Sequence, residues 1–295
     1  MRAVAFSEGV KVYCPEEGKF SFFNSPYPAH HYYSAVDIYP GRAYGEVAPS
    51  PVWGKVVAVR KVRCPEGKGF KGSNRDYVLL LRSLENSEVW VKILHVKPSV
   101  EIGRVIRAGD GLGTLIRSGF FDFWTDPHIH VEVRKPSDPI RARGGFKFKG
   151  LVKPKLEDGK EKLKALTGIV IEAKPEYSLI SPIGDFRYGI PVDVNGEVGF
   201  LDAGVPHYGF FGVHTYASPS LGAEVTLCGV KIGVVRSVYS SMCVAECSDL
   251  NFRLNGKPVR LSLYLFFSKP LLKIVPNKIG ELKLRRFEKV SVTIS

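Results

Sequence analysis

Short runs rich in Val, Ile, Tyr and Phe recur along all 295 residues, and Gly, Pro, Asn and Asp separate them. β-Branched and aromatic residues favour strands, and the separating residues favour turns. The pattern predicts a mainly β protein built from antiparallel strands. The clearest strand candidates are residues 56–62, 77–81, 90–95, 128–134 and 168–173, and residues 223–235 and 259–267 are typical of hairpins in a sandwich or small barrel.

One Lys-rich stretch, residues 155–166, has a helical pattern, but it is short and Gly159 interrupts it. We therefore expect an N-terminal β domain over residues 1–147 and a Lys-rich linker with a short helix over 148–166. A second, accessory all-β domain is expected over residues 167–295, and no motif in it indicates its role.

Composition excludes several classes of protein. Hydrophobic residues make up 44% and charged residues 24%, which is typical of a globular chain and not of a disordered one. No apolar run is long enough to span a membrane and no signal-peptide pattern opens the chain, so a cytoplasmic location is expected by default. Serine-nucleophile and P-loop motifs do not occur.

Charge and amide content add two expectations. The net charge of +13 is spread over both halves of the chain, a distribution that does not favour nucleic acid as a partner and leaves an acidic polymer open. The chain has no glutamine and many charged residues, a composition that is typical of thermophile proteins.

Five of the seven histidines lie in the first 130 residues. His128 and His130 are one residue apart in an alternating run, and residues i and i+2 of a strand face the same side. Two imidazoles side by side suit metal ligands or a ligand beside a catalytic base. A polar strand edge would give the same pattern.

A carboxylate could complete such a site. If the chain is extended before Asp37, then His31 shares its face and His30 points away. One carboxylate and two imidazoles leave one position on zinc open for water, as in hydrolytic sites. His95, at the end of an apolar run, supplies a further imidazole.

The segment Asp126–Arg134, with its His-x-His, resembles the signature of the lysostaphin-type zinc metallopeptidases, which have the duplicated hybrid motif fold. Other segments of the family have similar counterparts here in the same order. The resemblance covers about residues 25–136, and its further segments are residues 36–40, 48–57, 94–95, 103–113 and 118–119.

The resemblance implies a zinc-dependent endopeptidase with one zinc per chain, acting on a peptide or cell-envelope polymer. It implies that His31, Asp37 and His130 bind the metal. His95 and His128 would stay unliganded, deprotonate the attacking water and stabilise the oxyanion. Glu132 and Arg134, in the same run as His130, are expected to hold the strand and not to react.

One departure from the family bears on activity. The family's first histidine stands four residues before the aspartate, and Tyr33 occupies that position here, so His31 is two residues early. A bulge could absorb this shift. Alternatively Tyr33 fills the ligand position, and the chain is a catalytically degenerate protein- or glycan-binding module.

Overall fold

The computed structural model describes residues 1–153, 163 and 165–295 of the chain. The regular secondary structure of the described residues is almost entirely β strand, which confirms the predicted fold class. The helix expected within residues 155–166 falls largely on residues 154–162 and 164, which lie outside the described residues. In the described part of the chain, no helix has the length and apolar character needed to cross a membrane.

The chain forms two compact units. The first comprises Met1–Phe22 and Tyr27–Val152, and the second comprises Phe23–Pro26 and Lys153–Ser295. Four residues that lie far inside the N-terminal half of the sequence therefore pack with the C-terminal unit.

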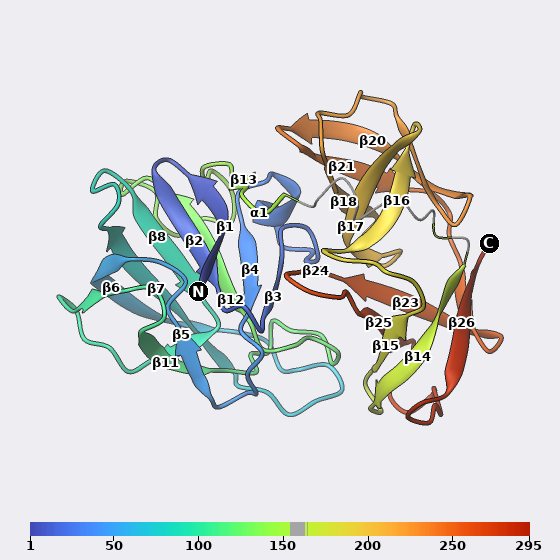
Figure 1. The fold of residues 1–295 in the computed structure, drawn as a ribbon. Coiled ribbons are helices and arrows are strands. Elements are labelled where there is room, and N and C mark those ends of the chain that lie inside the picture. The colour runs from blue at the N-terminus through green and yellow to red at the C-terminus, as the bar shows by residue number, and fades with distance from the viewer. Residues whose placement is uncertain (154–162, 164) are drawn as a thin grey trace. The chain divides into compact units, whose positions relative to one another are not determined.

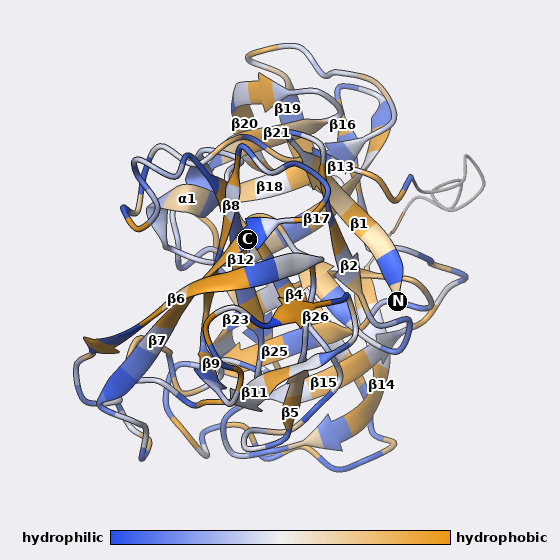
Figure 2. Cartoon of the chain, turned by 90° about the vertical axis from the view of Figure 1, so that its left-hand side faces the viewer, coloured by the Kyte–Doolittle hydropathy of each residue, from blue (hydrophilic) through white to orange (hydrophobic). Residues whose placement is uncertain are grey.

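The first unit is built around an antiparallel sheet with the strand order β10-β6-β7-β8-β12-β4-β3 (Figure 1). Two smaller three-stranded groups, β5-β11-β9 and β13-β1-β2, complete it. Along β6, hydrophobic and hydrophilic stretches alternate (Figure 2). The strands are β1 (Arg2–Ser7), β2 (Val10–Cys14), β3 (Lys19–Ser21), β4 (Val36–Tyr39), β5 (Val47–Pro49), β6 (Gly54–Arg63), β7 (Arg75–Ser83), β8 (Trp90–Leu94), β9 (Val96–Pro98), β10 (Val105–Ile106), β11 (Gly111–Leu115), β12 (Ile129–Arg134) and β13 (Lys149–Gly150), with one short helix, α1 (Pro28–His31).

Strand β12 occupies the middle of this sheet, between β8 and β4. All six of its residues are buried, so both faces of the strand are covered. Val131 and Val133 face one side, whereas His130, Glu132 and Arg134 alternate with them and bury their polar groups on the other side. Buried polar side chains need partners, which makes this face of β12 the place to look for a site.

In the second unit, the pairings of the described strands close two rings of six strands each. The first ring is β16-β19-β20-β21-β18-β17 and the second is β23-β22-β26-β14-β15-β25, and the long strand β17 also pairs with β23. The strands are β14 (Leu166–Ala173), β15 (Ser178–Pro182), β16 (Ile190–Val194), β17 (Glu197–Val205), β18 (Phe210–Thr215), β19 (Glu224–Leu227), β20 (Val230–Tyr239), β21 (Met242–Cys247), β22 (Phe252–Leu254), β23 (Lys257–Leu263), β24 (Leu265–Phe266), β25 (Leu272–Pro276) and β26 (Lys289–Ile294).

The segment Phe23–Pro26 is held in the second unit by packing and by hydrogen bonds. The Phe23 ring lies directly over Gly212, where an added Cβ would come within 1.9 Å of the ring. The amide Nδ2 of Asn24 donates to Ser262 Oγ at 2.9 Å and to the Leu263 carbonyl at 3.0 Å. Gly212 is therefore required by a close approach.

Candidate metal centre

Asp37 and His130 come together through strand pairing. Asp37 is the second residue of β4, and His130 is its direct cross-strand partner in β12. Directly opposite side chains in an antiparallel pair lie on the same face and in contact. The Oδ1 atom of Asp37 lies 2.9 Å from Nδ1 of His130, and both residues are buried.

The third member of the cluster is His30, not the expected His31. The expectation assumed an extended chain before Asp37, but Pro28–His31 forms the single helical turn α1, with Pro28 in its first turn. Successive helical residues point about 100° apart, so His30 is fully buried and its neighbour His31 is exposed. Tyr33 is also buried, and the Nζ atom of Lys147 lies 5.5 Å from the centroid of its ring.

Three possible metal-ligand atoms form a tight triangle: Nε2 of His30, Oδ1 of Asp37 and Nδ1 of His130. The separations are 3.2 Å between the two nitrogens, and 3.3 Å and 2.9 Å from His30 and His130 to the carboxylate oxygen. Two ligands bonded to one tetrahedral zinc lie about 3.3 Å apart, since each bond is about 2.0–2.1 Å. The donor set of two imidazoles and one carboxylate therefore fits a zinc ion.

Hydrogen bonds at the far side of each ring leave the correct nitrogen available. The Nδ1–H of His30 donates to the Phe22 carbonyl at 2.7 Å, so its Nε2 carries the lone pair. The Nε2–H of His130 donates to Glu132 Oε1 at 3.0 Å, so its Nδ1 is the nitrogen that can bind a metal. Both lone pairs point into the triangle.

Glu132 is itself anchored by two cations. Its Oε1 accepts from Lys92 Nζ at 2.6 Å and its Oε2 from Arg134 Nη1 at 3.0 Å, and all three side chains are buried. Burial would raise the pKa of Glu132, but the contacts with His130 and Lys92 outweigh it and lower the pKa. The carboxylate that orients His130 is thus ionised.

His128, just before β12, lies on the other side of Asp37. Its Nε2 is 3.8 Å from Asp37 Oδ2, and its Nδ1–H donates to the Asp126 carbonyl at 2.9 Å. The Phe121 ring stacks on it at 4.8 Å. Burial lowers the pKa of His128 to about 4, so the ring is neutral at pH 7 and Nε2 can accept a proton.

His95 stands next to His128, with ring centroids 4.9 Å apart. Its Nδ1 lies 2.6 Å from Oδ2 of Asp76, a buried aspartate at the start of β7. Burial would raise the pKa of Asp76, but His95, the Tyr77 N–H and Ser118 hold it at about 2. The pKa of Asp37 is likewise well below its usual value, because His30, His128 and His130 outweigh its burial.

The structure thus brings together four of the five residues singled out from the sequence, Asp37, His95, His128 and His130, and leaves out His31. Sequence reasoning missed His30 and Asp76. Pro28 is the signal for the helical turn that selects His30. Asp76 stands directly before the apolar run 77–81, so it is expected to be buried with that strand. A buried carboxylate needs a polar partner, and this is the feature that could have identified it.

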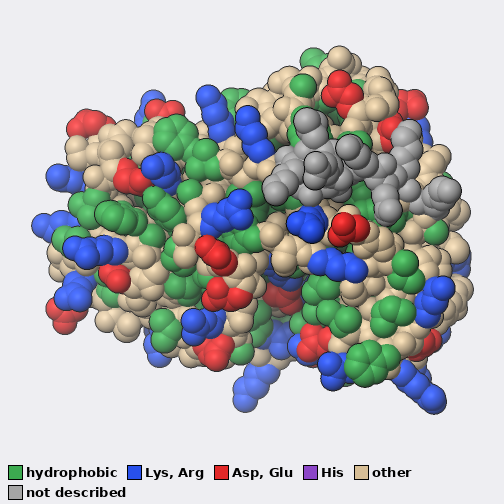
Figure 3. Space-filling model, viewed as in Figure 1, with side chains coloured by type: hydrophobic (Ala, Val, Ile, Leu, Met, Phe, Trp, Pro, Cys, Tyr) green, Lys and Arg blue, Asp and Glu red, His purple; other side chains and the backbone are tan. Residues whose placement is uncertain are grey.

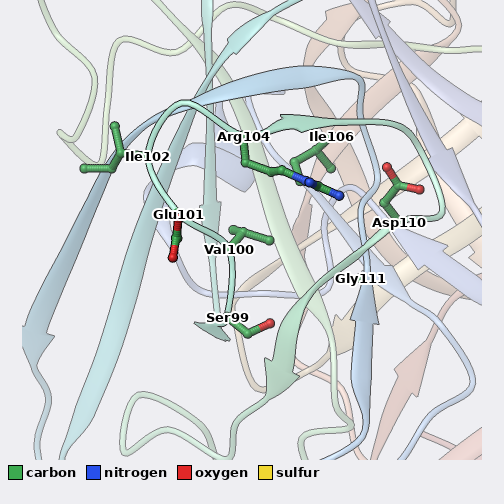
Figure 4. A pocket seen from close by; sticks show the side chains of 8 residues that line it. All are labelled: Ser99, Val100, Glu101, Ile102, Arg104, Ile106, Asp110 and Gly111. Atoms are coloured by element: carbon green, nitrogen blue, oxygen red, sulfur yellow. The ribbon is translucent and has the colours of Figure 1, made fainter.

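A surface hollow elsewhere in the first unit contains none of these residues. Figure 4 shows Arg104 reaching toward Asp110 across it, while Glu101 lies on its other side. No histidine lines this hollow, so the cluster above is the stronger candidate. The lining residues are Ser99, Val100, Glu101, Ile102, Arg104, Ile106, Asp110 and Gly111.

A family model described as "Domain of unknown function (DUF8155) N-terminal domain" matches residues 11–149. No curated protein matches the chain.

Two solved structures are similar over most of their length. The solution structure of lysostaphin is 15% identical, with a TM-score of 0.30, and the match covers 92% of each chain. The antimicrobial peptidase lysostaphin from Staphylococcus simulans is 14% identical, with a TM-score of 0.28 over 94% of this chain and 98% of that one. Likenesses this low establish neither the activity nor the ligands of this chain, which have to be inferred from its own side chains.

Proposed function

We propose that the first unit is a zinc-dependent metallohydrolase, an endopeptidase that cleaves peptide bonds. In this proposal His30, Asp37 and His130 hold one zinc ion per chain, and His95 and His128 together orient and deprotonate the attacking water. The observation that carries it is the triangle of three ligand atoms, 2.9–3.3 Å apart, with both imidazole lone pairs directed inward. A buried group of this kind with no function would be costly, because its charges have to be desolvated.

The chain's own residues supply the rest of the chemistry. When bound, the zinc ion would act as a Lewis acid toward a carbonyl group or a water molecule. His128 is neutral at pH 7, so its Nε2 can accept a hydrogen bond from an attacking water and orient it. The proton that the water loses passes to His95, and the protonated ring can then donate it to the leaving amine. Phe121 covers both His95 and His128 and reduces their contact with water, which strengthens electrostatic interactions at the site.

The substrate is proposed from the resemblance of residues 25–136 to the lysostaphin-type peptidases, which implies cell-wall-type peptides with small residues at the cut site. On the face seen in Figure 3, Lys and Arg side chains are scattered among acidic ones and are not gathered in one stripe. That distribution gives no support to a nucleic-acid substrate. We therefore place the substrate among peptides and peptide-bearing polymers of the cell envelope.

The test is metal content and peptide cleavage measured on the same full-length samples. We expect about one zinc per chain by mass spectrometry, lost in both Asp37→Ala and His130→Ala. A quenched-fluorescence peptide of glycine and alanine should be cleaved by the wild type, should resist cleavage after chelation, and should be cleaved again when zinc is returned.

Two results would oppose the proposal in different ways. No stoichiometric zinc, even after zinc is supplied and the excess removed, would remove the metal site and the hydrolase with it. Zinc binding without cleavage of the peptide or of a cell-envelope polymer would leave a metal-stabilised binding module.

A further inference from the structure

Asp76 makes an unusually complete set of contacts with His95. Its Oδ2 lies 2.6 Å from the ring nitrogen Nδ1, and its Oδ1 accepts from the backbone N–H of the same histidine at 3.1 Å. The two oxygens thus hold both the ring and the backbone of one residue. Asp76 is 1% exposed, and its pKa of about 2 keeps it ionised at neutral pH.

His95 needs this support because of its backbone. It lies between β8 and β9 with a φ of +70°, in the left-handed region that a residue with a Cβ rarely adopts. Such conformations cost free energy and persist where the surrounding structure enforces them. The hydrogen bond from the His95 N–H to Asp76 is one of the contacts that enforce it.

The contact also decides which ring nitrogen carries the proton. An ionised carboxylate can only accept, so the hydrogen at the 2.6 Å contact belongs to Nδ1 of His95. The other nitrogen, Nε2, forms no hydrogen bond with any residue in the described part of the chain. The ring is about nine-tenths buried beside His128 and Phe121.

We infer that Asp76 is a positioning residue, which holds His95 in the Nδ1–H tautomer and so presents the Nε2 lone pair to the reacting groups. The tautomer of His95 does not depend on the proposed function, but the role of its Nε2 atom in proton transfer rests on that function. Nε2 takes a proton from water as the water oxygen bonds to the carbonyl carbon, and returns it to the amine nitrogen as the C–N bond breaks. Asp76 stabilises the imidazolium that exists between these two steps.

Asp76 has other partners, so a purely structural role has to be separated from this one. Its Oδ1 also accepts from the Tyr77 N–H at 2.6 Å, and Ser118 bonds to its side chain. An asparagine can keep an oxygen toward these donors, but its amide then donates to Nδ1 and favours the opposite tautomer of His95. Asp76→Asn therefore separates tautomer control from backbone support.

The experiment measures the tautomer of the His95 ring by NMR and the kinetics of peptide cleavage on the same proteins. In zinc-loaded protein labelled with ¹⁵N-histidine, ring correlation spectra should show His95 with its proton on Nδ1 in the wild type and on Nε2 in Asp76→Asn. For cleavage of the glycine–alanine peptide, Asp76→Asn should lower kcat roughly 100-fold while KM and zinc content stay unchanged. Asp110→Asn, which changes an exposed aspartate of the same unit, is the matched control.

A second arm tests whether Asp76 acts through His95. In a His95→Ala background, Asp76→Asn should change kcat less than twofold, because the ring that it positions is gone. An equal loss of kcat in both backgrounds would overturn the inference. So would a wild-type His95 that carries its proton on Nε2, and this measurement needs no variant to fold.

The failure of this inference and the failure of the proposed function are distinguishable. A chain that neither binds zinc nor cleaves peptide, yet shows the tautomer change, would contradict the hydrolase and leave the positioning role. A zinc peptidase whose His95 tautomer and kcat are unaffected by Asp76→Asn would contradict only the positioning role.

Discussion

The Nε2 atom of His130 lies 3.0 Å from Oε1 of Glu132, two residues further along the same strand. Alternation along β12 puts both side chains on one face, so the strand itself delivers the metal-binding histidine and the carboxylate that orients it. Lys92 and Arg134 donate hydrogen bonds to that carboxylate without contacting the triangle. Ligand orientation at the site is therefore tied to the buried charges of the sheet.

From this contact we expect Glu132→Gln to weaken zinc binding about 10–100-fold, because a neutral amide oxygen accepts the Nε2–H of His130 more weakly than a carboxylate does, and the amide nitrogen would face the donor of Arg134. Competition with a chromophoric chelator measures the affinity. Glu88→Gln, at an exposed glutamate of the same unit, should leave it unchanged. Equal affinities in wild type and Glu132→Gln would show that the contact plays no part in metal binding.

The choice between two adjacent histidines gives a second prediction. His30→Ala should abolish stoichiometric zinc binding, because it removes one corner of the ligand triangle. His31→Ala changes an exposed ring that lies outside the cluster and should retain about one zinc per chain. Mass spectrometry measures the zinc content of both purified variants. Zinc lost in His31→Ala and retained in His30→Ala would show that His31, and not His30, binds the metal in solution.

How far the sequence predicts this site depends on the kind of contact. The pair His128 and His130 follows from alternation within one strand, which a local sequence pattern predicts well. Asp37 meets His130 across a strand pairing, and it was expected at the site from the family resemblance. His31 was expected in place of His30 because the spacing argument assumed an extended chain, and one helical turn at Pro28 exchanges which histidine is buried. Asp76 meets His95 across a strand pairing, and no local spacing records that contact.

The fold shows the same limit. The β composition and the strand runs near residues 77–81 and 128–134 are local properties, and they appear in the structure as β7 and β12. The ring closure that pairs Leu166 of β14 with Val292 of β26 joins residues far apart in the sequence. Many partners would satisfy the same apolar pattern, so periodicity alone does not choose among them.

The Asp76 carboxylate gives a prediction for acid unfolding of the metal-free protein. Its pKa is about 2 in the folded chain against an ordinary value of 3.8, so the unfolded chain binds the proton at higher pH. The stabilisation, about 2 kcal/mol, is complete above about pH 5 and is lost as pH falls from about 4 toward 2.

Urea unfolding of wild type and Asp76→Asn between pH 2 and 6, with chelator present, measures this loss. The difference between the two unfolding free energies should shrink as pH falls through that window. Subtracting the unfolding free energy of Asp76→Asn from that of the wild type removes the contributions of the other carboxylates, because both proteins contain them. Parallel curves for the two proteins would mean that Asp76 and His95 are not paired in the folded chain.

The last prediction concerns the segment Phe23–Pro26, which packs with the second unit although it lies inside the N-terminal half of the sequence. Gly212→Ala would put a Cβ within 1.9 Å of the Phe23 ring, and we expect it to cost about 1–3 kcal/mol of unfolding free energy. In a Phe23→Ala background the clash is gone, so the same change should cost less than about 0.5 kcal/mol. Urea unfolding of the four proteins gives the coupling, and an equal cost in both backgrounds would mean that Phe23 does not lie over Gly212.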